Sequence, residues 1–325
     1  GLLAQQNSGQ PGSDAVSLRI RGSSTFDRNN DPLVLVDGVE RPFNSINAEE
    51  VENITVLKDA STTAVYGIRG ANGVVLVTTK RGTTGKPQIN FATNFALQTP
   101  TRLPEFANAH DYAFLYNEAL KNDNPLLTPA QLLFSEADLQ KYKDGSDPIF
   151  HADVDWMDFM IKKTAPQSKN TLTVSGGGQS AKYFLSLGYL AQDGLWKEFN
   201  EQYGYSNNTT YNRYNFRSNI DFNVTKSTVF GLSVGGYSDK MHTAGNPFAY
   251  IQATPSLVTP GLIDDKIIID SRVTGRNPIP EISAGYDERF ANEFNLTADL
   301  NQKLHFLVKG LTFRSKMGFD SDYRT

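Results

Sequence analysis

The sequence contains no cysteine, so it can form no disulfide framework, thiol nucleophile or cysteine-type zinc site. It also lacks an apolar run of about 18 residues, which excludes a transmembrane helix. The mean hydropathy of −0.41 does not exclude a membrane β-barrel, because barrel strands alternate lipid-facing apolar residues with inward polar ones.

The sequence also has no large excess of either positive or negative charge. The net charge is −4 and the isoelectric point is about 5.6, so there is no basic footprint and we expect no nucleic-acid partner. The first residues, Gly1 to Ala4, have neither the basic start nor the long apolar core of a signal peptide.

Residues 50–81 have the pattern of one folded unit. We predict a strand over Asn53–Leu57, a helix over Ala60–Tyr66 and a strand over Val74–Lys80. Asp59 is expected to cap the helix, and Gly67 to end it in the left-handed conformation.

The residues before this unit add further short elements. Alternation predicts a half-buried strand over Val16–Ile20, and Leu33–Val36 is a wholly apolar strand followed by a turn at Asp37-Gly38. Asn47 and Glu50 have the spacing at which each side chain can satisfy the other's backbone N–H group. Residues 1–84 are therefore predicted to form a small α+β domain.

Beyond Pro87 the sequence alternates apolar and polar residues with a period of two. Seven such stretches predict seven strands, at 89–98, 171–175, 183–189, 214–224, 230–235, 294–301 and 311–320. The connections between them are alternately long and short, as expected when every second connection faces the same side of a membrane. We predict that residues 85–325 form the N-terminal portion of a transmembrane antiparallel β-barrel with long extracellular loops. Since bacterial barrels have even strand numbers of eight or more, further strands are expected beyond Thr325.

The first long connection is expected to be ordered. Tyr112, Leu115, Tyr116 and Ala119 mark the predicted inner face of one helix. Capping boxes begin further helical turns at residues 128–131 and 135–138, and Gly145 is the predicted stop. Asp155 is expected to cap a third helix.

Candidate chemical sites are few. His151, Asp153 and Asp155 could form a cation site or a carboxylate pair, but a solvated loop or helix cap is the preferred interpretation. Residues 27–31 resemble the start of a calcium loop, yet Pro32 and Gly38 occupy the positions that need glycine and glutamate. Residues 82–87 lack the spacing of a phosphate loop and are predicted to be a linker. We predict no enzyme activity, no metal site and no cofactor.

An aromatic loop between residues 196 and 214 is a candidate binding site. Trp196, Tyr203 and Tyr205 lie among asparagine and glutamine residues, a combination that suits sugars or peptide backbones. The alternative is an aromatic girdle at the membrane interface together with contacts to a partner protein.

Five motifs in order identify a family resemblance. Their sequences are LRIRG (18–22), PLVLVDGV (32–39), LKDAS (57–61), YG (66–67) and RGANGVVLVTT (69–79). Together they resemble the plug domain of TonB-dependent outer-membrane transporters, specifically the SusC/RagA nutrient-uptake family.

The resemblance implies a plug inside a 22-stranded barrel in the outer membrane of a Gram-negative bacterium, surrounded by lipid. It implies import of an oligosaccharide or peptide, with a SusD-like surface lipoprotein as a lid and the TonB complex of the inner membrane as the energy source. An N-terminal extension with a TonB box is expected upstream of Gly1. The alternatives are a siderophore or vitamin receptor of the same superfamily and a secreted β-rich glycan-binding protein.

The motif residues are predicted to be structural or to take part in gating. They are Arg19, Arg21, Gly22, Asp37, Gly38, Lys58, Asp59, Tyr66, Gly67, Arg69, Gly70, Asn72 and Gly73. The charged members are expected to form ion pairs and hydrogen bonds within the plug or to a polar barrel wall, or to assist transport-linked movement.

Overall fold

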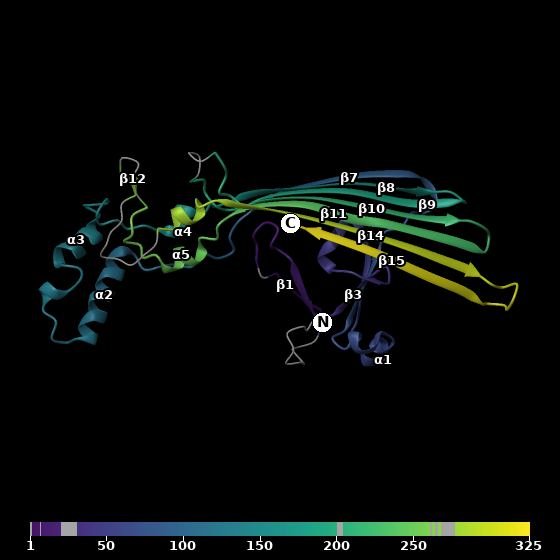
Figure 1. Ribbon diagram of the computed structural model, residues 1–325, viewed down its shortest axis with the longest axis horizontal. Coiled ribbons are helices and arrows are strands. Elements are labelled where there is room, and N and C mark those ends of the chain that lie inside the picture. Colours follow the sequence, from purple (N-terminus) through teal and green to yellow (C-terminus); the bar gives the residue numbers. More distant parts are fainter. Residues whose placement is uncertain are drawn as a thin grey trace.

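The computed structural model describes residues 2–6, 8–20, 31–199, 204–260, 262–263, 266–267 and 277–325. In these residues a small N-terminal unit lies against one face of a long, curved, seven-stranded sheet, and helical loops extend beyond one end of that sheet (Figure 1). No helix within the described residues is long and apolar enough to cross a membrane.

The N-terminal unit is built on a four-stranded sheet in the order β4-β3-β6-β5. Its strands are β3 (Leu33–Val36), β4 (Val39–Glu40), β5 (Val51–Leu57) and β6 (Val74–Thr79), with β3 and β6 parallel. A separate two-stranded sheet pairs β1 (Leu3–Gln6) with β2 (Val16–Arg19).

A small apolar core holds these strands together. It is formed by Leu18, Ile20, Val36, Val75 and Val77. Gly73 closes the turn before β6 with a φ of 94°, and a Cβ atom there would lie 2.7 Å from Cδ1 of Ile20. The glycine of the RGANG motif is therefore required both by its backbone conformation and by close packing.

The predicted helix after β5 is shorter than expected. Helix α1 (Ala60–Thr63) passes directly into the 3₁₀ helix η3 (Ala64–Gly70). The backbone carbonyl of Asp59 accepts hydrogen bonds from Thr62 and Thr63. Gly67 has a positive φ of 59°, but its ψ of −147° produces a kink inside η3 and not the predicted helix end.

The predicted reciprocal cap at Asn47 and Glu50 is present with one change of partner. Two short 3₁₀ helices, η1 (Phe43–Ser45) and η2 (Ala48–Glu50), precede β5. Asn47 accepts from the backbone of Glu49 as the N-cap of η2. The Glu50 carboxylate interacts with the backbone N–H group of Asn47, as predicted, but its main partner is Arg217 of the large sheet.

All seven predicted strands are present in the large sheet, and most are longer than the sequence pattern indicated. The order β7-β8-β9-β10-β11-β14-β15 follows the chain, and all neighbouring strands are antiparallel. The strands are β7 (Gly85–Gln98), β8 (Ala165–Gly177), β9 (Ala181–Asp193), β10 (Thr210–Asn223), β11 (Thr228–Ala244), β14 (Tyr286–Lys303) and β15 (Thr312–Arg324). Strand β7 begins at Gly85, so the linker is shorter than predicted.

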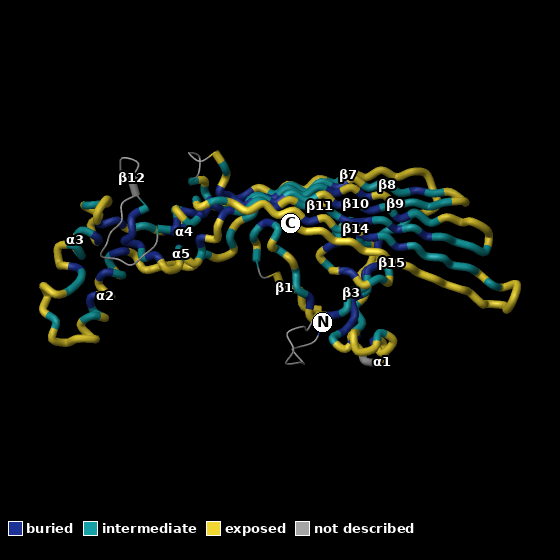
Figure 2. Tube along the Cα trace, viewed as in Figure 1, coloured by how far each residue is buried: buried dark blue, intermediate teal, exposed yellow. Residues whose placement is uncertain are grey.

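The two faces of this sheet differ in polarity. On β10 the side chains of Asn215, Arg217 and Asn219 are buried, whereas Tyr214 and Phe222 are exposed. This inverted arrangement, with polar residues covered and apolar residues outward, is that of a membrane barrel wall. Figure 2 shows the buried and half-buried positions along the middle strands and the exposed chain at the β15 edge.

Long connections lie at one end of the sheet and short turns at the other (Figure 1). The long ones contain α2 (Ala109–Asp123), η4 (Pro129–Gln131), α3 (Glu136–Asp144), α4 (Trp156–Met160), α5 (Phe248–Ala253), β12 (Leu262–Ile263), β13 (Lys266–Ile267) and α6 (Pro278–Ile282). They share an apolar core with Phe134, Trp156, Met160, Trp196 and Ile251 at its centre. The loops therefore fold as one module.

The capping predictions in this module are confirmed, but the predicted inner face of α2 is only partly right, since Tyr112 packs against the core and Leu115 does not. Ser135 and Asp155 cap α3 and α4, and Gly145 ends α3 with a φ of 64°. On α2 the buried side chains are those of Ala109, Ala113 and Asn117, while Leu115 is 59% exposed. The helix is rotated toward its small residues because the Asn117 amide bonds the backbone of Phe134.

Candidate functional site

The face of the large sheet that meets the N-terminal unit is the main polar interface of the molecule. The N-terminal unit lies beneath the concave side of the sheet (Figure 1), and ion pairs and hydrogen bonds join the two. Three groups of these contacts are centred on Glu50, Arg81 and Arg41 of the N-terminal unit, and Arg213 of β10 also donates to the backbone carbonyls of Asn44 and Ser45.

The most deeply buried contact is the ion pair between Glu50 and Arg217. Arg217 Nε donates to Glu50 Oε2 at 2.6 Å, and each side chain is only 2% exposed. Burial raises the pKa of the Glu50 carboxyl above its ordinary value of 4.5, although the adjacent Arg217 acts in the opposite direction. Glu50 Oε1 and Arg217 Nη1 are buried and have no hydrogen-bond partner within the described residues. The pair is therefore only partly satisfied.

The second group anchors the end of β6 and the linker that follows it. Arg81 Nη1 donates to Asp221 Oδ1 at 2.7 Å, and its Nη2 lies 3.9 Å from Asp299 Oδ2. The Asn219 amide donates to Thr79 Oγ1 at 2.9 Å and to the carbonyl of Lys80 at 2.7 Å. These bonds fix the point at which the chain leaves the N-terminal unit for the wall.

The third group lies toward the β15 edge. Arg41 is 5% exposed and donates to Asp320 Oδ1 at 2.9 Å and to Thr297 Oγ1 at 2.9 Å. Nearby, Lys316 of β15 donates to the backbone carbonyl of Asp37. The side chain of Asp37 accepts from the backbone N and the hydroxyl of Thr79.

Glycines in the wall allow this close approach. A Cβ atom at Gly188 would lie 2.8 Å from Nδ2 of Asn47, and one at Gly318 would lie 3.0 Å from Cγ1 of Val39. At Gly235 a Cβ atom would lie 3.0 Å from Cζ of Arg217. These glycines on β9, β11 and β15 thus leave the space that the N-terminal unit and the Arg217 side chain occupy.

A polar interface of this kind can hold the N-terminal unit on the sheet and still allow it to be released. Buried ion pairs gain little net stability over apolar packing, but removal of one partner leaves a buried charge and costs about 3–5 kcal/mol. Polar contacts of this kind fix one orientation of the N-terminal unit, and water can replace them when the unit moves away.

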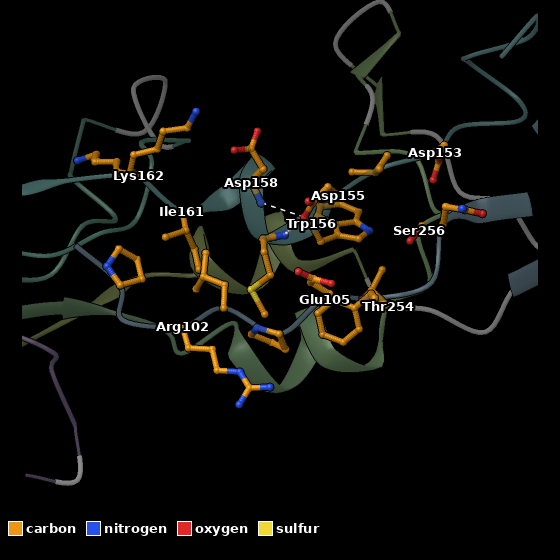
Figure 3. Close-up of a pocket in the computed structure, with 18 of the residues that line it drawn as sticks. Arg102, Glu105, Asp153, Asp155, Trp156, Asp158, Ile161, Lys162, Thr254 and Ser256 are labelled. Atoms are coloured by element: carbon orange, nitrogen blue, oxygen red, sulfur yellow. Dashed lines mark hydrogen bonds between the residues drawn. The ribbon is translucent and has the colours of Figure 1, made fainter. Parts of the chain in front are cut away.

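A second candidate region is a cavity of about 800 Å³ in the loop module. It is lined by residues 99–108, by the segment around α4 and by Thr254 and Ser256 (Figure 3). Asp153 accepts from the backbone of Ala109 at 2.8 Å, and Asp155 accepts from Met157 and Asp158 as the cap of α4. Both carboxylates therefore serve helix starts.

His151 does not join these carboxylates. Its ring nitrogens lie 2.9 Å from Asp147 Oδ2 and 2.8 Å from Asp138 Oδ1, and the Tyr142 ring packs against it. The predicted grouping of His151 with Asp153 and Asp155 is therefore absent. Within the described part of the chain, no cluster of three or more histidine or acidic side chains could hold a metal ion.

The predicted motif residues fall mainly inside the N-terminal unit. Arg69 forms an exposed ion pair with Glu40, and Asp37 bonds Thr79 as described above. Arg21 and Gly22 lie outside the described residues, as does the stretch 27–30 of the rejected calcium loop. Arg41, Glu50, Arg81 and Arg217, which carry the interface, were not among the predicted site residues. The one sequence signal for these residues was the alternation of polar and apolar residues along β10. It indicated that Arg217 faces inward, but it did not identify the residue that Arg217 would bond.

The aromatic loop is partly buried. Trp196 is 5% exposed in the core of the loop module, and its ring packs edge-on against Phe248 with centroids 5.1 Å apart. The Tyr205 hydroxyl donates to the carbonyl of Ser283 at 2.6 Å. Tyr203 lies outside the described residues. A role of these residues in ligand binding stays a prediction.

Comparisons with known proteins agree with this architecture. A family model described as TonB-dependent Receptor Plug Domain matches residues 2–74. TonB-dependent receptor P3 of Formosa agariphila is 30% identical over 98% of this chain and 29% of its own length. TonB-dependent receptor SusC of Bacteroides thetaiotaomicron is 26% identical over 94% of this chain and 31% of its own length. The chain thus spans under a third of these relatives.

Solved structures share the fold. The RagAB peptide importer in its open-open state matches with a TM-score of 0.76 and 21% identity, over 100% of this chain and 38% of the matched chain. The RagAB structure in the closed-closed state matches with a TM-score of 0.73. The fold is therefore that of a plug domain seated on part of an antiparallel barrel wall. Residues 2–74 thus carry the plug domain of TonB-dependent receptors, and the chain as a whole is similar to receptors of this class, SusC among them, as its motifs predicted.

Proposed function

We propose that this chain forms the plug and the first part of the barrel of an outer-membrane transporter. This transporter imports an oligosaccharide or a peptide with energy delivered by the TonB complex. In this proposal residues 1–84 form the plug and residues 85–325 belong to the barrel, with the boundary directly after the anchored residues Thr79 to Arg81. A SusD-like surface lipoprotein would close over the loop module.

The polar interface between plug and wall is the observation that carries the proposal. A permanently docked domain would gain more from apolar packing, whereas this interface relies on ion pairs such as Glu50–Arg217 and Arg81–Asp221. The outward apolar residues of the wall, among them Phe91 and Phe319, suit contact with lipid. The curated relatives named above are receptors of this class and not enzymes, which also supports the proposal.

A reversible cross-link tests whether the plug must move. A Cβ atom at Gly318 would lie 3.8 Å from Cβ of Val39, which is the usual separation in a disulfide. Because these 325 residues contain no cysteine, the double variant Val39→Cys/Gly318→Cys introduces one cysteine pair into this part of the full-length protein and would join plug to wall through that bond. The oxidising envelope favours its formation.

We expect the cross-linked transporter to lose TonB-dependent uptake of labelled oligosaccharide or peptide in whole cells, and a reductant to restore it. Each single cysteine variant is the control and should transport normally. Uptake that continues after complete cross-linking would contradict movement of this part of the plug. TonB-dependent uptake of a ferric chelate in place of both nutrients would favour the siderophore-receptor alternative.

The partner is tested on the same cells. The full-length tagged protein, extracted from total membranes in mild detergent, is expected to bring down a surface lipoprotein in stoichiometric amount. A protein that leaves the cells without detergent would contradict the assignment to the outer membrane.

A further inference from the structure

A buried histidine ties helix α3 to the segment that follows it in the loop module. Figure 1 shows α3 in the outer part of that module, away from the sheet. The helix ends at Gly145, and a turn closed by the bond from the His151 backbone N–H to the carbonyl of Asp147 brings the chain back against it. The His151 side chain is only 7% exposed. The Tyr142 ring of α3, which belongs to the apolar core of the module, packs edge-on against it with centroids 5.0 Å apart.

Each ring nitrogen of His151 faces a carboxylate. Nε2 lies 2.8 Å from Oδ1 of Asp138 in the first turn of α3, and Nδ1 lies 2.9 Å from Oδ2 of Asp147. A neutral imidazole has one N–H donor and one lone pair, whereas an imidazolium has two N–H donors. With a neutral ring, one nitrogen lone pair would face a carboxylate oxygen at hydrogen-bond distance. Only the charged ring satisfies both contacts.

Other donors keep both carboxylates ionised. Asp138 Oδ2 accepts from the backbone N–H and the hydroxyl of Ser135 in the capping box of α3. Asp147 Oδ1 accepts from the backbone N–H of Phe150, and Lys141 Nζ lies 3.4 Å from Asp147 Oδ2. Burial acts to raise the pKa of the Asp147 carboxyl, but the hydrogen bonds that it accepts, the one from the ring included, lower it below its ordinary value of 3.8. The proton of this cluster therefore belongs on the ring.

This arrangement makes the attachment of α3 sensitive to pH. Among the described residues, the ionisable groups that face the ring are Asp138 and Tyr142 of α3 and Asp147 of the turn, and Lys141 bonds the last of them. Histidine ordinarily changes its charge between about pH 5 and 8. When the ring loses its proton, one of its two charge-assisted bonds becomes a contact between a lone pair and a carboxylate, which weakens the hold on α3.

We propose that His151 is a pH-sensitive clasp, which holds α3 to the loop module when its ring is charged and loosens the helix when the ring is neutral. The clasp is complete at acidic pH and loses one bond as the pH rises. The inference concerns the loop module alone and does not rest on the proposed import function, so either can fail without the other.

The test is hydrogen exchange of the α3 amides in the full-length protein in detergent at pH 5 and pH 8. Rates are expressed as protection factors, which remove the intrinsic pH dependence of exchange. We expect protection of Glu136–Asp144 to be about tenfold higher at pH 5, the effect of one hydrogen bond to a charged group.

Two histidine variants assign the effect. His151→Gln keeps an amide side chain of similar size that carries no charge at either pH, so the difference between pH 5 and pH 8 should disappear. His110→Gln is the matched control. His110 lies 3.1 Å from the Asp111 carboxylate on α2, but its side chain is 32% exposed, and its loss should leave the pH dependence of α3 unchanged.

Asp147→Asn tests the clasp without removing the ring. The amide oxygen of the asparagine can still accept from the Phe150 N–H, and its NH₂ group can donate to Nδ1 of a neutral ring. We therefore expect this variant to lose the higher protection at pH 5 or to show higher protection at pH 8.

Two results would overturn the inference. One is equal protection of α3 at both pH values in the unsubstituted protein, and the other is a tenfold advantage at pH 5 that persists in His151→Gln or in Asp147→Asn.

Discussion

Replacing Arg217 by methionine should weaken the docking of the plug on the wall more than the loss of an exposed ion pair on the plug surface. The substitution keeps much of the side-chain volume but removes the guanidinium group that faces Glu50. The Glu50 side chain is 2% exposed, so its carboxylate would stay buried without a charged partner. Loss of one member of a buried pair costs about 3–5 kcal/mol.

The double variant Glu50→Leu/Arg217→Met should recover most of this loss. In the unsubstituted protein Glu50 Oε1 and Arg217 Nη1 already lack partners within the described residues, so the pair gains little over apolar packing. The coupling free energy between the two substitutions should therefore be large, at least about 2 kcal/mol.

Hydrogen exchange measures both effects in the full-length protein in detergent. A loss of about 3 kcal/mol should speed exchange of the β5 and β6 amides roughly a hundredfold, because they become exposed when the plug opens. Arg69→Met is the matched control. Its ion pair with Glu40 has side chains 66% and 47% exposed, so the change should cost less than about 1 kcal/mol.

The pH dependence gives an independent check. The pKa of Glu50 is raised in the folded protein, so docking is favoured below its ordinary value of 4.5 and weakens as pH rises through the folded value. Removal of Arg217 takes away the group that lowers this pKa, so the Arg217→Met defect should be smaller at acidic than at neutral pH. Additive single substitutions, or a defect that grows on acidification, would refute the reasoning.

Three further substitutions test the packing and the caps. Gly188→Val should displace Asn47 and make the plug more sensitive to protease, whereas the control Gly178→Val, in an open turn, should not. Equal cleavage of the two variants would contradict close packing at β9. Asp155→Ala removes two N-cap hydrogen bonds from α4 and should lower the stability of the loop module by about 1 kcal/mol, measured by thermal unfolding. Gly145→Ala places a side chain at a φ of 64° and should cost about 1 kcal/mol in the same assay, so an unchanged melting temperature would argue against the left-handed stop.

The sequence predicted the wall better than the interface. A period of two is a local property, and it located all seven strands and the inward face of β10. Local capping signals likewise located the starts of α3 and α4 at Ser135 and Asp155. These features depend on residues a few positions apart, which one sequence displays directly.

The errors arose where a distant partner decided the outcome. The sequence pattern assigned Glu50 to a local cap alone, but its carboxylate also bonds Arg217, which lies 167 positions further along the chain. The apolar residues of α2 predicted an inner face with Leu115, but the Asn117 amide bonds Phe134 and turns the smaller residues inward.

The sequence by itself therefore determined the class of this protein, through its plug motifs, its alternating strands and its alternately long and short connections. The tertiary structure alone decided which charges meet between plug and wall, which glycines make room for them, and which aromatic residues stay buried in the loop module. The physical reason is the distance along the chain over which each kind of interaction acts. Strand period and helix caps are set by neighbouring residues, whereas ion pairs and cavities arise only when segments far apart in the chain are brought together.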